Sequence, residues 1–148
     1  MKYNNCAKGK YKVKYPKKYK GDASNVTYRS SWELGCMVYF DTNPDIMWWG
    51  SEEIVIPYRS PIDGKLHRYF PDFIVKTSKS DTIVFEVKPA IQSRPPKKRA
   101  RITKKYLNEV KTWGINQAKW DAAVEYCADR QWKFQVITED HLFKKNNK

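Results

Sequence analysis

The sequence predicts an α/β (α+β) fold in which a mixed sheet is flanked by helices. A helical pattern comes first, a run of short strand patterns follows it, and further helical patterns enclose one last strand pattern. The expected order of elements is therefore α-β-β-β-α-β-α. With 148 residues, of which 41% are hydrophobic and 15% aromatic, the chain is long enough for one domain with a single core.

The first helix is expected over residues 30–42. Ser30 can cap it, Glu33 lies at the right spacing for a capping box, and Asn43-Pro44 ends it. Apolar residues occur nearly all round this helix, which predicts that it is largely buried. A carboxylate at Glu33 is costly in such a helix unless it has a partner.

Four apolar segments follow, a short piece and then three strand patterns, and we expect them to form an antiparallel meander. They are apolar and rich in β-branched residues, and they cover residues 46–49, 53–58, 66–77 and 82–88. Asp63-Gly64 supplies a turn between the second and the third, and Pro71 interrupts the third. A polar turn at 78–81 precedes the fourth pattern, which is the clearest strand in the chain.

The remaining elements complete the domain. A basic loop over residues 89–105 leads into helical patterns at 102–112 and 116–129. In the second of these, Trp120, Ala123, Val124 and Cys127 recur at helical spacing, so we expect all four to face the core. A strand at 133–137 and a short helix after Thr138 come last. The expected boundaries are an arm over 1–28, a folded domain over 29–143 and a tail over 144–148.

Positive charge is concentrated in two segments of the chain, whose net charge is +13. Residues 1–20 contain eight lysines, residues 89–105 contain seven lysines or arginines, and neither segment contains an acidic residue. Such blocks favour a polyanionic partner bound in a salt-sensitive way. We rank nucleic acid ahead of a membrane because no stretch pairs these charges with an apolar face.

Other classes of protein are disfavoured by composition. No apolar run approaches the ~18 residues of a membrane span, and the first residues lack the apolar centre of a signal peptide. Three cysteines without CxxC spacing argue against a disulfide scaffold or a zinc ribbon. We therefore expect a protein without a membrane partner.

We expect the basic residues of the two charged segments to contact DNA. The tyrosines that interleave with the lysines of the arm, Tyr3, Tyr11, Tyr15 and Tyr19, either stack on bases or pack on the domain. Arg29, before the first helix, either holds a phosphate or pairs with an acid. The candidate DNA-binding residues are Lys10, Lys12, Lys14, Arg29, Arg94, Lys97, Lys98, Arg99 and Arg101.

Candidate chemistry lies in two successive strand patterns. Because side chains alternate along a strand, Glu86 and Lys88 project from the same face. Asp72 follows Pro71 in the preceding pattern, and the turn between the patterns brings their ends together. The sequence therefore predicts that Asp72, Glu86 and Lys88 lie close together.

These residue types suit a metal-assisted reaction at a phosphodiester. Asp72 and Glu86 could share Mg²⁺, which prefers oxygen ligands and acidifies a bound water. Lys88 would orient the attacking water or stabilise the oxyanion that forms. Glu33 would contribute a third carboxylate from the first helix.

Each of these residues also has a plain structural interpretation. A second Glu-x-Lys, Glu109 to Lys111, lies in a helical pattern and indicates a surface ion pair. Asp72 could merely end a strand, Glu33 could merely close the capping box, and Lys88 could face solvent. Taken together, in this order and in a chain with two basic segments, they favour a metal-dependent nuclease.

The series Glu33, Pro71-Asp72 and Glu86-Val87-Lys88 resembles the motif of the PD-(D/E)XK nuclease superfamily. The resemblance implies a restriction-endonuclease-like αβββαβ core and Mg²⁺ as the cofactor, with Mn²⁺ able to replace it. It also implies Glu33, Asp72 and Glu86 as metal ligands, a metal contact from the Val87 carbonyl, and Lys88 as the catalytic lysine. Some members use a Gln or Lys on the next helix at the active site, which makes Gln117 and Lys119 candidate site residues. Lys119 is also a candidate for DNA binding.

Longer segments resemble the head-completion nucleases of T-even-type tailed phages. These segments are residues 28–33, 51–58, 68–73 and 85–89. The resemblance implies endonuclease and exonuclease activity on double-stranded DNA, trimming packaged DNA so that heads can join tails. It further implies portal or neck proteins as partners, action in the host cytoplasm during assembly, and association with the virion.

Two alternatives remain, of which the first belongs to another class of protein. One is a DNA-binding head-tail joining protein that does not cut, although such a protein has no need for the carboxylate and lysine set. The other is a junction-resolving or transposase-type endonuclease, because both groups share parts of the same pattern. The sequence does not determine the oligomeric state, the cut-site preference or the number of metal ions. It also does not determine whether the arm is ordered before DNA binds.

Overall fold

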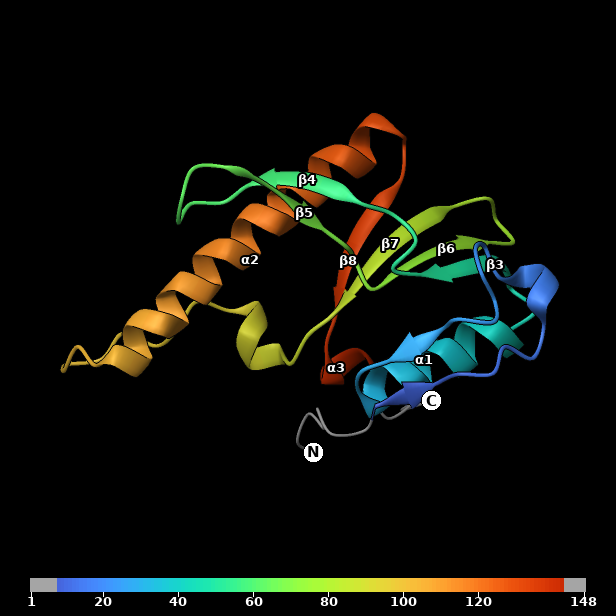
Figure 1. Cartoon of the computed structure of the whole chain (residues 1–148), viewed down its shortest axis with the longest axis horizontal. Helices are drawn as coiled ribbons and strands as arrows, with labels where there is room; N and C mark the ends of the chain where they lie inside the picture. Colours follow the sequence, from blue (N-terminus) through green and yellow to red (C-terminus); the bar gives the residue numbers. More distant parts are fainter. Residues whose placement is uncertain (1–7, 143–148) are drawn as a thin grey trace.

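A four-stranded sheet with one helix on each face forms the centre of the protein (Figure 1). The computed structural model describes residues 8–142. The sheet contains β3 (Ile46–Ser51), β6 (Phe73–Thr77), β7 (Thr82–Val87) and β8 (Lys133–Ile137), in that spatial order. The first three are antiparallel, and β8 runs parallel to β7. The predicted mixed sheet flanked by helices is therefore confirmed.

The predicted simple meander is wrong, because a hairpin is inserted within it. β4 (Ile56–Arg59) and β5 (Leu66–Tyr69) pair only with each other, and β3 pairs directly with β6. The hairpin leaves the sheet after Glu52, whose φ is +56°. It returns at Pro71, which cannot donate to a strand ladder and divides the predicted strand 66–77 in two. The hairpin packs on the long helix instead (Figure 1).

Helix α1 (Ser31–Thr42) begins where its cap predicts. The Ser30 hydroxyl accepts a hydrogen bond from the Glu33 amide at 3.1 Å. The expected burial all round the helix is wrong, because Val38 is 43% and Tyr39 57% exposed. The sheet covers only one side of α1, and the apolar residues on the other side face solvent.

Helix α2 (Lys104–Asp129) is continuous, so the prediction of two helices is wrong. Gly114 lies inside it, where packing against β4 and β8 outweighs the ~1 kcal/mol propensity penalty of glycine. Trp120, Ala123 and Cys127 are buried as predicted, whereas Val124 is 55% exposed. No helix among residues 8–142 is long and apolar enough to cross a membrane.

Residues 8–28 share the core of the domain. β1 (Gly9–Lys10) pairs with β2 (Thr27–Tyr28), a 3-10 turn covers Pro16–Lys18, and Val13 and Val26 are buried beside α1. The rings of Tyr11 and Tyr19 lie 6.1 and 4.8 Å from Trp49 between centroids. These two tyrosines therefore pack on the domain, whereas Tyr15 is exposed. Tyr3 and the tail 144–148 lie outside the described residues.

A fully buried carboxylate anchors this opening segment to α1. Asp41 accepts a hydrogen bond from the Tyr11 hydroxyl at 2.6 Å. It also accepts the backbone amides of Lys14 at 2.7 Å and Tyr15 at 3.2 Å. A helix residue thus supplies acceptors for the amides of Lys14 and Tyr15, which belong to no strand.

Replacing Asp41 with alanine is expected to lower the free energy of unfolding by about 3–5 kcal/mol, because two amides and a hydroxyl lose their acceptor. Urea denaturation at 25 °C measures the change. Asp45→Ala, at an exposed position after the same helix, is the control and should lie within ~0.5 kcal/mol of the wild type. A loss below ~1 kcal/mol for Asp41→Ala would show that water replaces the carboxylate without difficulty.

Candidate active site

Three acidic residues line up where neighbouring strands end. Ser51 of β3 is opposite Phe73 of β6, and Phe73 is opposite Phe85 of β7. One step further along each strand, the same register brings Glu52, Asp72 and Glu86 side by side. The register of the sheet therefore places Asp72 beside Glu86, as the sequence predicts.

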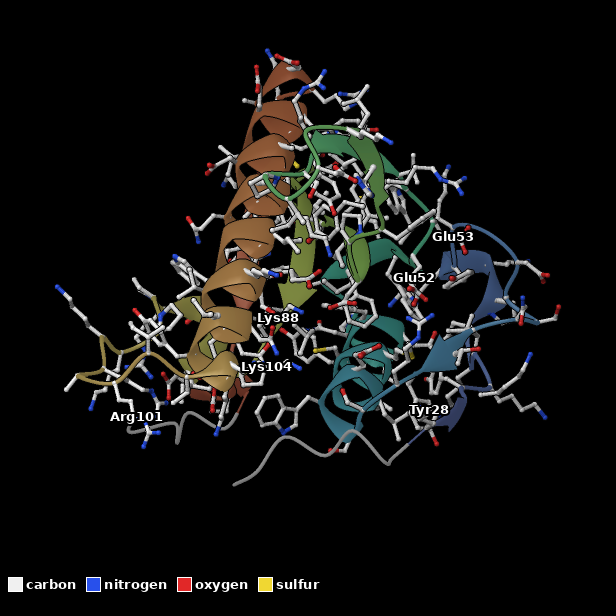
Figure 2. The ribbon with its side chains drawn as sticks, turned by 60° about the vertical axis from the view of Figure 1, so that its left-hand side comes forward. Tyr28, Glu52, Glu53, Lys88, Arg101 and Lys104 are labelled. Atoms are coloured by element: carbon white, nitrogen blue, oxygen red, sulfur yellow. The ribbon has the colours of Figure 1, made fainter. Side chains whose placement is uncertain are left out.

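The start of α1 closes this edge of the sheet and adds Glu33. Together these elements form an open pocket, which Lys8, Arg29, Glu33, Asp72, Glu86, Val87 and Lys88 line. Four residues predicted as a catalytic set, on α1, before β6 and at the end of β7, thus face one space. In Figure 2, Lys88 lies between α2 and α1.

Each carboxylate has a hydrogen-bond partner in the protein. Asp72 Oδ2 accepts the Val87 amide at 2.8 Å. Glu86 Oε1 accepts the Tyr69 hydroxyl at 2.8 Å, while its Oε2 lies 3.5 Å from Lys88 Nζ. Lys88 therefore stands beside Glu86, as the alternation of strand side chains predicts.

Glu33 retains a role in the helix cap while it lines the pocket. Its Oε1 accepts the Arg29 amide at 3.4 Å, and its Oε2 accepts the Ser30 hydroxyl at 3.4 Å. Only 7% of Glu33 is exposed. The structural and the functional interpretations of this residue are therefore compatible.

The carboxylates of the pocket hold their protons more tightly than ordinary ones. Burial, together with the charges of Glu86 and Glu33, raises the pKa of Asp72 well above its usual value. Burial raises the pKa of Glu86 and of Glu33 as well, and Lys88 opposes the shift at Glu86. A bound cation would offset the cost of burying these charges and the repulsion that Asp72 and Glu33 meet from their neighbours.

The oxygen donors of Glu33, Asp72 and Glu86 fit a hard divalent cation that keeps part of its water shell. Within residues 8–142, no three His, Cys, Asp or Glu side chains are gathered into a ready-made metal cluster. The three carboxylates face one pocket, but each is turned toward a protein partner.

Sequence reasoning missed two residues of this site. Tyr69, from β5, is only 4% exposed and holds one oxygen of Glu86. Lys8 lines the pocket from the opening segment. Tyr69 precedes Asp72 by three residues, but the function of that position depends on the inserted hairpin. No sequence signal distinguished Lys8 from the other lysines of its segment.

Lys119, which only the family resemblance suggested as a site residue, faces the same region from α2. Its Nζ lies 5.8 Å from the ring centre of Tyr58 and 5.6 Å from that of Tyr69. Burial and the charge of Lys88 lower the pKa of Lys119, and Glu86 and Asp72 oppose this. A half-buried ammonium thus stands behind Glu86. Gln117 does not line the pocket.

The other candidate DNA-binding residues are exposed and lie outside the lining of the pocket. Lys10, Lys12 and Lys14 are exposed on the opening segment, and Lys10 donates to Asn25. The second basic set, Arg94, Lys97, Lys98, Arg99 and Arg101, is exposed between Ser93 and α2. None of these residues lines the pocket. Figure 2 shows Arg101 well away from Lys88, beside the start of α2.

Comparisons with known proteins agree with this geometry. Residues 43–139 match the family described as TnsA-like endonuclease N terminal. Over 138 residues the chain is 42% identical to the protein named head completion nuclease of Enterobacteria phage T4, covering 90% of this chain and 92% of that protein. No solved structure matches the chain.

The family match covers well over half of the chain and includes Asp72, Glu86 and Lys88. The phage relative extends the likeness through the N-terminal region, because nine tenths of the chain is aligned. The superfamily resemblance read from the motifs is thereby confirmed. The chain belongs to the TnsA-like endonucleases, a PD-(D/E)XK family with a restriction-endonuclease-like fold, and is a nuclease homologous to a phage head completion nuclease.

Proposed function

We propose that this protein is a Mg²⁺-dependent nuclease of double-stranded DNA that acts in phage head completion. It trims packaged DNA by endonuclease and exonuclease cuts so that heads can join tails. The observation that supports the reaction most directly is the convergence of Glu33, Asp72, Glu86 and Lys88 on one pocket. The family typically depends on a divalent metal, and the name of the phage relative supports the biological setting.

Glu33, Asp72 and Glu86 would hold the metal, with the Val87 carbonyl as a further oxygen donor. When bound, Mg²⁺ acidifies a water and offsets negative charge on the phosphate, and Mn²⁺ serves the same purpose. Tyr69 occupies one oxygen of Glu86. The other oxygen faces Lys88, which orients the attacking water and balances charge on the phosphorane.

The cations around the pocket position the substrate. Arg29 lines the pocket and reaches the phosphate nearest the cut. Lys119 adds positive charge behind Glu86. Lys10, Lys12 and Lys14 on one side and the basic loop on the other contact flanking phosphates, which makes binding fall steeply with salt. The partners in assembly are portal or neck proteins, met in the host cytoplasm or on the virion.

The proposal predicts that plasmid and linear duplex are cut with Mg²⁺ and not with EDTA. Glu86→Gln should reduce cutting by at least about 100-fold, because an amide replaces a charged ligand but still accepts the Tyr69 hydroxyl. Gel analysis of supercoiled, nicked and linear forms measures this. Glu125→Gln, at an exposed position on α2, is the matched control and should cut normally.

Two results would redirect the proposal. A folded wild type that binds DNA but never cuts it with Mg²⁺ or Mn²⁺ would favour the non-catalytic joining protein. Strong preference for four-way junctions over linear duplex, by a dimer, would favour the junction-resolving class. Equal cutting of branched and linear duplex supports head completion.

A further inference from the structure

Glu52 has an unusual backbone conformation for a glutamate. Its φ of +56° lies in the left-handed region, which glycine and asparagine adopt readily and other residues avoid. Ser80 and Gln131 share this region among the non-glycine residues described, and both lie in tight connections between elements. Glu52 directly follows Ser51, the last residue of β3, and the register of the sheet places it in the same row as Asp72 and Glu86.

The neighbours of Glu52 hold this conformation in place. Its amide donates to the Asp72 carbonyl at 3.1 Å. The Tyr19 hydroxyl binds the residues on both sides of Glu52. It accepts a hydrogen bond from the Ser51 amide at 3.0 Å and donates one to the Glu53 carboxylate at 2.8 Å. In Figure 2, Glu53 lies beside the blue opening segment and Glu52 lies nearer the centre of the molecule. The strain is therefore imposed from both sides and directs the Glu52 side chain.

The Glu52 side chain reaches Arg29 on the wall of the pocket. The Arg29 Nη1 donates to Glu52 Oε1 at 2.5 Å, and Glu52, Glu33 and Asp72 all raise the pKa of Arg29. The Arg29 side chain remains 56% exposed, and its guanidinium has donors left over for another acceptor. An ordinary surface pair contributes little to stability and would not by itself favour a strained backbone.

We propose that Glu52 is a positioning residue that fixes the Arg29 guanidinium toward the DNA phosphate in the pocket. This inference rests on the proposed function and concerns the substrate side of the same site. A glycine or an asparagine would occupy the position without strain, but neither supplies a carboxylate that reaches Arg29. The strained glutamate is explained by that contact.

The test compares Glu52→Gly and Arg29→Lys, singly and together, on a short duplex with Mg²⁺. Each single variant is expected to lower kcat/KM about 10-fold, because a charge-assisted orientation is lost. The double variant should be no worse than the worse single one, since both act through one contact. Duplex Kd in EDTA should weaken in parallel.

Thermal stability separates this role from a structural one. The Tm of Glu52→Gly should be unchanged or raised by up to about 4 °C, because glycine relieves the backbone strain. Ser80→Gly relieves the same kind of strain in an exposed turn and is the control. Its Tm should likewise be unchanged or raised, while its kcat/KM stays at the wild-type value.

Several outcomes would overturn the inference while leaving the proposed function intact. They are unchanged kcat/KM and Kd in Glu52→Gly, faster cutting by that variant, or additive losses in the double variant. Failure of the proposed function looks different, because the wild type itself would then show no Mg²⁺-dependent cutting. In that case the duplex Kd values alone decide whether Glu52 positions Arg29.

Discussion

Replacing Lys88 with alanine is expected to reduce Mg²⁺-dependent cutting by about 1000-fold while DNA affinity stays largely unchanged. Lys88 Nζ lies 3.5 Å from Glu86 Oε2, and the Lys88 amide donates to the Ile137 carbonyl at 2.9 Å. The side chain is thus held at the carboxylates by β8. As one cation among many, Lys88 is expected to contribute little to DNA affinity.

Single-turnover cutting with Mg²⁺ and filter binding without it separate the two effects. Lys88→Arg keeps the charge on a larger group, and we expect it to recover only part of the rate, because a guanidinium does not match the position of an ammonium. Lys111→Ala removes the lysine of the other Glu-x-Lys and should cut normally. Full turnover by Lys88→Ala would remove this residue from the mechanism.

Replacing Asp72 with asparagine is expected to abolish cutting and, at the same time, to stabilise the metal-free protein. The folded-state pKa of Asp72 is raised. The stability that this carboxyl contributes is therefore fully present below its unfolded pKa and is lost as pH rises through the folded pKa. Asparagine does not titrate, and its oxygen can still accept the Val87 amide. In EDTA at pH 7–8 the variant should gain about 1–2 kcal/mol, an advantage that disappears toward pH 4.

Urea denaturation in EDTA between pH 4 and 8 tests whether Asp72→Asn is more stable than the wild type at high pH and loses this advantage at low pH. Added Mg²⁺ should raise the Tm of the wild type and leave that of Asp72→Asn nearly unchanged, because binding to the folded state alone stabilises it. Asp121→Asn, exposed on α2, is the matched control and should leave both cutting and the pH dependence alone. A variant less stable than the wild type at pH 7–8 would mean that Asp72 is ionised and stabilising without metal.

The sequence predicts most of the site because its signals are local. Strand alternation places Lys88 beside Glu86, and Pro71 marks the start of the strand that Asp72 directly precedes. The sequence does not predict that the ladder joins β3 to β6 and excludes β4. Strand pairing depends on which backbone segments meet in space, and the patterns at 53–58 and 66–77 fit a meander equally well.

The residues that sequence reasoning missed depend on that same tertiary arrangement. Tyr69 reaches Glu86 only because the inserted hairpin folds over the sheet toward α2. The continuity of α2 through Gly114 likewise comes from packing, since propensity alone favours a break there. Burial on one side of α1 could not be read from an apolar pattern that surrounds the helix.

The residues that line and support the pocket come from distant parts of the chain, so the pocket forms late during synthesis on the ribosome. Lys8 comes from near the start of the described chain, while β8, which holds the Lys88 backbone, comes from near its end. A nascent chain on the ribosome therefore carries all of its early lysines before the catalytic set can assemble. Under the proposed function, the growing polypeptide would bind DNA through these lysines and would not cut it until β8 docks.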